Sequence, residues 1–195
     1  MIRRARFLAV VVTVLAGAIT VIASTQTWLS VLLSDGSSEQ LEVAGAAAVP
    51  VLAPLGLATL ALGGALSIVG SVLRYVFGVL GVAIAGILAV LAVRIAFSAP
   101  VDAVAGTVTT ATGIAGADAV ADLVASISVT PWPAITLAAQ IVLGAAAVFT
   151  LATAHAWRTG AGRRYRTEAQ TPPASAGPRH DAIDSWDDLS RGEDP

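Results

Sequence analysis

Four apolar stretches, none with an internal acid and each close to or above the length that crosses a bilayer, limit what this chain can fold into. They are residues 7–24, 44–71, 75–98 and 132–157. A helix needs about 20 apolar residues to cross about 30 Å of hydrocarbon. A crossing segment must satisfy its own backbone hydrogen bonds, and none of the four alternates as a barrel strand does. The sequence therefore predicts an all-α membrane protein with four transmembrane helices.

Basic residues lie almost entirely on one side of these stretches. The chain has 11 arginine and lysine residues, all of them arginine, and only Arg94 falls inside a predicted span. The others precede residue 7, stand between the second and third spans at Arg74, or follow residue 157. The two segments on the opposite side, 25–43 and 99–131, contain acids but no bases. Because cytoplasmic loops are enriched in arginine, both termini are predicted to be cytoplasmic in a multi-pass inner (plasma) membrane protein.

Composition agrees with a bilayer as the main environment and partner. Hydrophobic residues make up 56% of the chain and mean hydropathy is +0.80, which is unusual for a soluble domain. A cleaved signal peptide is the alternative for the first stretch, because Arg3, Arg4 and Arg6 precede a short apolar run that ends at Ala23-Ser24. Cleavage would leave three spans. We prefer an uncleaved anchor.

Prolines and small residues predict how the spans are built. Pro50 and Pro54 lie in the outer third of the second span and predict a kink or a late helix start. Small or polar residues recur every four positions in three spans, namely Thr59, Gly63, Ser67 and Ser71, then Gly81, Ala85 and Ala89, then Thr136, Gln140 and Gly144. Such stripes allow close helix packing in lipid and predict the bundle interior, with a substrate path as the alternative.

The two outer segments are expected to form small structures of their own. Asp35-Gly36 stands between two β-compatible runs, 28–33 and 37–43, which predicts a short hairpin. In the second segment, a flexible stretch is followed by residues that share one helical face, Ala117, Val120, Ala121, Val124 and Ile127, with Asp118 and Asp122 opposite. This pattern predicts an interfacial helix lying against the bundle.

Three tryptophans and two polar residues are singled out by their position in the spans. Trp28, Trp132 and Trp157 stand at predicted membrane borders, where tryptophan commonly anchors a protein at the interface. Arg94 is about one turn from the outer end of its span, where its side chain is expected to reach the surface and pair with Asp102. An intramembrane polar site formed by Arg94 and Gln140 is the functional alternative.

Three short motifs carry a resemblance to a known family. Thr130-Pro131-Trp132-Pro133 opens the last span, Arg163-Arg164-Tyr165 follows it, and the chain ends in Asp184-Ser185-Trp186-Asp187-Asp188-Leu189-Ser190-Arg191-Gly192-Glu193-Asp194-Pro195. In this layout the chain resembles the tryptophan-operon-associated actinobacterial membrane protein family over nearly its whole length. The resemblance implies a membrane location and a link to tryptophan biosynthesis. It implies no catalytic residues.

The terminal motif has the chemistry of a docking element at the end of a tail. Residues 161–195 are polar and rich in proline, alanine and serine, which predicts a disordered cytoplasmic tail after a membrane domain of residues 1–160. Candidate docking residues for a cytoplasmic protein partner are Trp186, Asp187, Asp188, Leu189, Arg191 and Glu193. A solvated tail whose acids only maintain solubility is the alternative.

Several kinds of chemistry are not predicted. The chain has no cysteine, and its two histidines, His155 and His180, stand far apart, so the sequence predicts no metal site and no cofactor. It contains no phosphate-binding loop or nucleophile elbow, and its arginine clusters lack the aromatic residues of a nucleic-acid surface. We expect neither enzymatic activity nor nucleic-acid binding.

The preferred functional hypothesis is a non-enzymatic membrane tether or accessory protein that acts through its tail. The alternative is a small transporter, or a transporter subunit, for an aromatic or related metabolite. An outward-facing sensor that uses the acidic outer segments is a third hypothesis, supported only by the size of the second segment. The sequence does not predict an oligomeric state.

Overall fold

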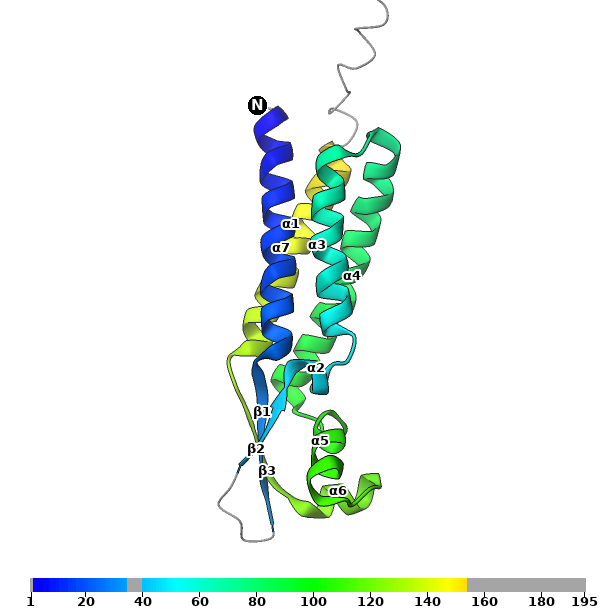
Figure 1. The fold of residues 1–195 in the computed structure, drawn as a ribbon. Coiled ribbons are helices and arrows are strands. Elements are labelled where there is room, and N and C mark those ends of the chain that lie inside the picture. The colour runs from blue at the N-terminus through cyan, green and yellow to red at the C-terminus, as the bar shows by residue number, and fades with distance from the viewer. Residues whose placement is uncertain (1, 35–39, 154–195) are drawn as a thin grey trace, which may run out of the picture. The chain divides into compact units, whose positions relative to one another are not determined.

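The computed structural model describes residues 2–34 and 40–153, which belong to one compact unit, Met1–Thr159. Four long helices lie side by side, α1 (Ile2–Thr25), α3 (Leu52–Ile68), α4 (Ser71–Ser98) and α7 (Trp132–Thr153) (Figure 1). Six shorter elements gather at one end of this bundle, β1 (Thr27–Leu33), β2 (Gln40–Ala44), α2 (Gly45–Ala48), α5 (Asp102–Thr112), α6 (Ala117–Leu123) and β3 (Val124–Val129). We call these six elements the head.

Among the described residues, three of these four helices have the length and the apolar composition needed to cross a membrane. They contain the segments Phe7–Thr25, Val72–Ser98 and Trp132–Thr153. The remaining predicted span, the second one at 44–71, forms instead a single turn of helix α2 and the 17-residue apolar helix α3, which begins at Leu52. Pro50 lies between α2 and α3, and Pro54 lies in the first turn of α3. Proline is tolerated there because the backbone N–H groups of the first turn have no partner within the helix. The late helix start expected from the two prolines is confirmed.

Small residues bring the helices into contact along two antiparallel seams. A Cβ atom placed on Gly17 of α1 would lie 2.9 Å from the backbone nitrogen of Leu60 in α3, and one on Gly63 would lie 2.7 Å from Val14 Cγ2. Between α4 and α7, a Cβ on Gly81 would lie 3.2 Å from that of Ala147. The expected interior positions of Thr59, Gly63, Gly81 and Ala85 are therefore found, whereas Ser67 is exposed. Glycine is needed at these seams because any side chain would push two helices apart.

A three-stranded antiparallel sheet in the head corrects the all-α prediction. Its order is β2-β1-β3, with Leu29 of β1 opposite Val43 on one side and Val129 on the other. The pairing of β1 with β2 confirms the strands of the predicted hairpin, whose turn at Asp35-Gly36 lies outside the described residues. One face of the sheet carries Leu29, Val31 and Val43, which are fully buried with Val104 and Val108 of α5 and Val120 of α6. The opposite face is polar, because Ser30, Glu42 and Ser128 share it.

The second outer segment differs most from its prediction. Helix α5 occupies Asp102–Thr112, where a flexible stretch was expected. The predicted interfacial helix exists only as α6, Ala117–Leu123, and the chain from Val124 to Val129 is strand β3. Val124 and Ile127 fit a helical face by spacing, but an irregularity in the register of β1 and β3 places them opposite Leu33 and Val31, on one face of the sheet. Pairing with β1 also satisfies backbone groups that a helix would leave exposed at the sheet edge. Asp118 and Asp122 are exposed, as expected.

The glycine seam gives a direct test of the bundle. Gly17→Ala should lower the free energy of unfolding by about 1–3 kcal/mol, because its new methyl group meets the backbone of α3 at Leu60 and Gly56. Thermal unfolding of the purified protein in mild detergent measures the loss. Gly86→Ala is the matched control, since a Cβ there meets nothing within 4 Å. Equal stability of the two variants would contradict the α1–α3 packing described above.

Candidate functional site

An ion pair at the end of α4 next to the head is the first polar feature of interest. Arg94 Nη2 donates a hydrogen bond of 2.7 Å to Asp102 Oδ2 at the start of α5. This is the pairing expected from the sequence. The helix ends at Ser98, and Ala99 adopts a left-handed conformation with φ of 38° that directs the chain through Pro100 into α5. That corner carries Asp102 back over the last turn of α4.

A pocket of about 170 Å³ opens beside this ion pair. Arg94 and Asp102 provide its charged side, while Val49, Leu91 and Ile95 provide apolar walls. Val49 and Ile95 also belong to the hydrophobic core, in which they are 4% and 3% exposed. The pocket therefore has a fixed apolar floor and a charged, solvent-accessible rim, and we call it the rim pocket.

The second polar feature lies inside the bundle. Gln140 of α7 is 1% exposed, and its Nε2 donates a hydrogen bond of 2.8 Å to Thr20 Oγ1 of α1. Thr20 in turn donates to the carbonyl of Ala16. Among the described residues, Gln140 Oε1 and Thr136 Oγ1 have no hydrogen-bond partner, although both are buried. Gln140 thus links α1 to α7, while its own Oε1 and the Oγ1 of Thr136 remain without a partner in a low-dielectric interior.

The structure does not combine Arg94 and Gln140 in one site. Along the antiparallel α4–α7 seam, Gly78 faces Leu151, Gly81 faces Ala147 and Ala85 faces Gly144. This register places Gln140 level with the turn of Leu88, more than one turn short of Arg94. Arg94 also points to the rim pocket, whereas Gln140 bonds to α1. The two residues belong to separate polar features.

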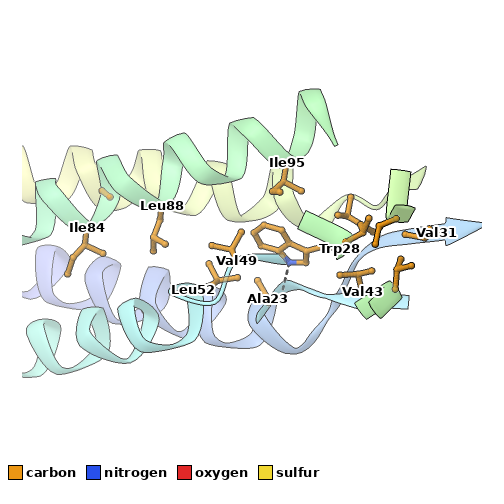
Figure 2. Close-up of a cluster of buried hydrophobic side chains, with 14 of the residues drawn as sticks. Ala23, Trp28, Val31, Val43, Val49, Leu52, Ile84, Leu88 and Ile95 are labelled. Carbon is orange, nitrogen blue, oxygen red and sulfur yellow. Dashed lines mark hydrogen bonds between the residues drawn. The ribbon is translucent and has the colours of Figure 1, made fainter. Parts of the chain in front are cut away.

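Trp28 has a different role from the interface anchor expected of it. Its side chain is fully buried, and its Nε1 donates a hydrogen bond of 2.9 Å to the carbonyl of Ala23. Figure 2 shows the indole between Ala23, Val49 and Ile95, where the head meets the bundle. An anchor presents its ring to lipid head groups, so a ring enclosed by protein acts as a packing element instead. Trp132 is partly buried against the same core, and Trp157 lies outside the described residues.

Gly45 is the residue at this junction that sequence patterns missed. A Cβ atom on Gly45 would lie 2.6 Å from both Trp28 Nε1 and the carbonyl oxygen of Ala23, so only glycine leaves room for the indole and its hydrogen bond. Thr20 was missed as well, because 120 residues separate it from Gln140. A helical projection of the first span would have marked Thr20 as one polar residue among apolar neighbours without indicating its partner.

The remaining candidate residues lie beyond the described part of the chain. The docking candidates Trp186, Asp187, Asp188, Leu189, Arg191 and Glu193 are among them, as are His155 and His180. Within residues 2–34 and 40–153, no three histidine, cysteine, aspartate or glutamate side chains gather as metal ligands.

Removing the hydroxyl of Thr136 and removing that of Thr20 are predicted to change the free energy of unfolding differently. Thr136→Val should raise the free energy of unfolding by about 1 kcal/mol or leave it unchanged, because it removes a buried hydroxyl without a partner. Thr20→Val should lower it by about 1–2 kcal/mol, because Gln140 loses the acceptor of its hydrogen bond. Thermal unfolding in detergent distinguishes the two. A clear loss of stability in Thr136→Val would show that this hydroxyl has a partner.

Comparison with known proteins identifies the family. No curated protein and no solved structure is significantly similar to the chain. The family model described as "tryptophan-associated transmembrane protein" matches residues 10–195, which include most of α1, all of α3, α4 and α7, the head and the terminal motif. The match confirms the resemblance inferred from the motifs around Trp132, Tyr165 and Trp186. The chain belongs to the tryptophan-associated transmembrane protein family.

Proposed function

We propose that the protein is a non-enzymatic accessory protein of the inner membrane, associated with tryptophan biosynthesis, which crosses the bilayer four times. Three apolar helices and the family assignment support a membrane protein. Its four-span topology, its orientation and its role as a tether are the parts that we propose.

The sheet requires an even number of membrane crossings between β2 and α5. Strands β1, β2 and β3 are hydrogen-bonded neighbours, so they lie on the same side of any membrane. The chain leaves the sheet at Ala44 and returns to the head at Asp102, and α4 accounts for one crossing between these points. A return to the same side requires a second crossing, for which α3 is the only long helix in that stretch. Its 17 residues span about 25 Å, a shortfall that local thinning or the neighbouring helices accommodate.

The arginine distribution then orients the bundle. Arg74 lies at the start of α4, at the end away from the head, and α1 begins at the same end with Arg3, Arg4 and Arg6. Helix α7 also ends there, and further arginines follow residue 157 in the sequence. By the positive-inside rule this end faces the cytoplasm, and the head, whose described charged residues are all acids, faces outward, with Arg94 at the neighbouring end of α4.

Close packing of the helices favours an accessory role over transport. At Gly17, Gly63 and Gly81 the paired helices lie so close that an added Cβ atom would come within 3.2 Å of the facing helix. A transporter needs a path that opens and closes between its helices, and α1–α3 and α4–α7 are in contact along their length. A packed bundle of this kind serves as an anchor. The partner would be recruited by the cytoplasmic tail, through Trp186 and the acids around it.

Transport remains the second candidate because of one observation. Gln140 and Thr136 place unpartnered polar atoms one turn apart inside the bundle, which is a feature of substrate pathways as well as of helix association. Several copies of the chain would be needed to build a path. Uptake and efflux assays with tryptophan and its precursors, in cells with and without the protein, distinguish this candidate from the tether.

Single cysteines test the topology, since the natural chain has none. Ser126→Cys in the exposed part of β3 should react with a membrane-impermeant maleimide in intact cells. Gly70→Cys, in the connection between α3 and α4, should react only after the membrane is permeabilised. Labelling of both positions in intact cells would contradict the proposed crossing of α3.

The tail hypothesis is tested by crosslinked affinity purification from membranes. The full chain should recover a cytoplasmic enzyme or regulator, and a chain truncated before Asp184 should lose it. Trp186→Ala should reduce recovery at least about tenfold, because a central aromatic anchor commonly contributes most of the binding energy of a short motif. Ser190→Ala, in the same motif, is the matched control and should bind normally. Equal recovery by Trp186→Ala and the full chain would rule out docking through Trp186.

A further inference from the structure

We propose that the rim pocket at the head binds a small zwitterion, a molecule that carries an ammonium group and an anionic group close together beside an apolar portion. The site consists of Arg94, Asp102 and the apolar walls formed by Val49, Leu91 and Ile95. It is separate from the tail and does not depend on the proposed tether role.

The ion pair supplies both halves of a receptor for such a molecule. Arg94 donates one hydrogen bond to Asp102 through Nη2, and a guanidinium has five N–H donors in total. An anionic group on a ligand can accept from the remaining donors, while its ammonium group donates to the Asp102 carboxylate. The side chains of Arg94 and Asp102 are 55% and 63% exposed, and an exposed pair of this kind opens at little cost.

The pocket beside the pair has the size and the walls for the apolar portion. A cavity of about 150 Å³ lined by apolar side chains is large enough to bind benzene, and this pocket has about 170 Å³. The site therefore accepts an aromatic ring or a branched aliphatic group, with its charged end at the rim. A purely ionic ligand would leave the apolar walls unused, and a purely apolar ligand would leave the ion pair unused.

The backbone around the pocket is fixed before any ligand arrives. Pro50 and Pro100 both line it, and proline fixes its own φ angle. Ala99, between the two charged residues, holds a left-handed conformation that is costly for a residue other than glycine and that places Asp102 over Arg94. A receptor that is already ordered loses little entropy on binding, which favours a small ligand.

Two sources supply this chemistry. One is a free α-amino acid with an apolar side chain, for which L-tryptophan is the probe suggested by the family. The other is an aminophospholipid such as phosphatidylethanolamine, whose phosphate and ammonium groups lie at the membrane surface. Binding of L-tryptophan to the full-length protein in detergent, compared with tryptamine and indole-3-propionate, tests the first source, because each analogue lacks one of the two charges. Native mass spectrometry after extraction from bilayers with and without phosphatidylethanolamine tests the second.

Variants connect either ligand to the pocket. Arg94→Gln and Asp102→Asn should each weaken binding at least about tenfold, the typical effect of losing a hydrogen bond to a charged group. Ala103→Leu keeps both charges and should also weaken binding, because its larger side chain enters the pocket. Asp118→Asn is the matched control, since that exposed carboxylate lies on α6 and does not line the pocket. Thermal unfolding confirms that each variant is folded.

The outcomes are distinct. Saturable binding of L-tryptophan that is weaker for both analogues and for all three pocket variants supports the site with a free amino acid. Retention of phosphatidylethanolamine by the natural chain but not by these variants supports the site with a lipid head group. If folded pocket variants and the Asp118→Asn control bind both probes as the natural chain does, or if the natural chain binds neither, the proposal is overturned. None of these measurements depends on Trp186, so failure here leaves the tether hypothesis unaffected.

Discussion

Strand β1 pairs on one edge with β2 and on the other with β3, and these hydrogen bonds hold together segments that two long helices separate in the sequence. The sheet brings the end of α1, the beginning of α3 and the beginning of α7 to one place, and α5 covers its apolar face. The pairing of β1 with β3 and the packing of α5 on the sheet together fix the second outer segment relative to the first. The sheet therefore helps to fix both the positions of the helices in the bundle and the positions of the residues in the head.

The junction of head and bundle is built around one side chain. Trp28 is the second residue of β1, its indole N–H donates to the carbonyl of Ala23, and Gly45 packs against the indole without a side chain of its own. Buried indoles contribute a large apolar area together with a polar group that needs a partner, and this site provides both. Val49 and Ile95 extend the same core to the rim pocket, so the rigidity of the junction also fixes one wall of the candidate ligand site (Figure 2).

Local patterns predicted what depends on neighbours in the sequence. Pro50 and Pro54 indicated the late start of α3, Asp35-Gly36 located β1 and β2, and the pairing of Arg94 with Asp102 followed from a separation of eight residues. Features that depend on distant segments were not predicted. Residues 124–129 fit a helix by spacing until β1 is known to lie beside them, and Trp28 resembles an interface residue until Gly45 is known to enclose it. Gln140 and Thr20 are joined only by the packing of α1 against α7.

The central position of β1 also determines the order in which the protein can be completed during synthesis. Thr130 Oγ1 donates to the backbone carbonyl of Thr27, 103 residues earlier in the sequence, at the point where β3 ends beside β1. One edge of β1 therefore has no partner strand while α3, α4, α5 and α6 are synthesised, and open strand edges recruit other chains. The third strand can join the sheet only after residues 124–129 have been synthesised, and these residues come shortly before α7 in the chain.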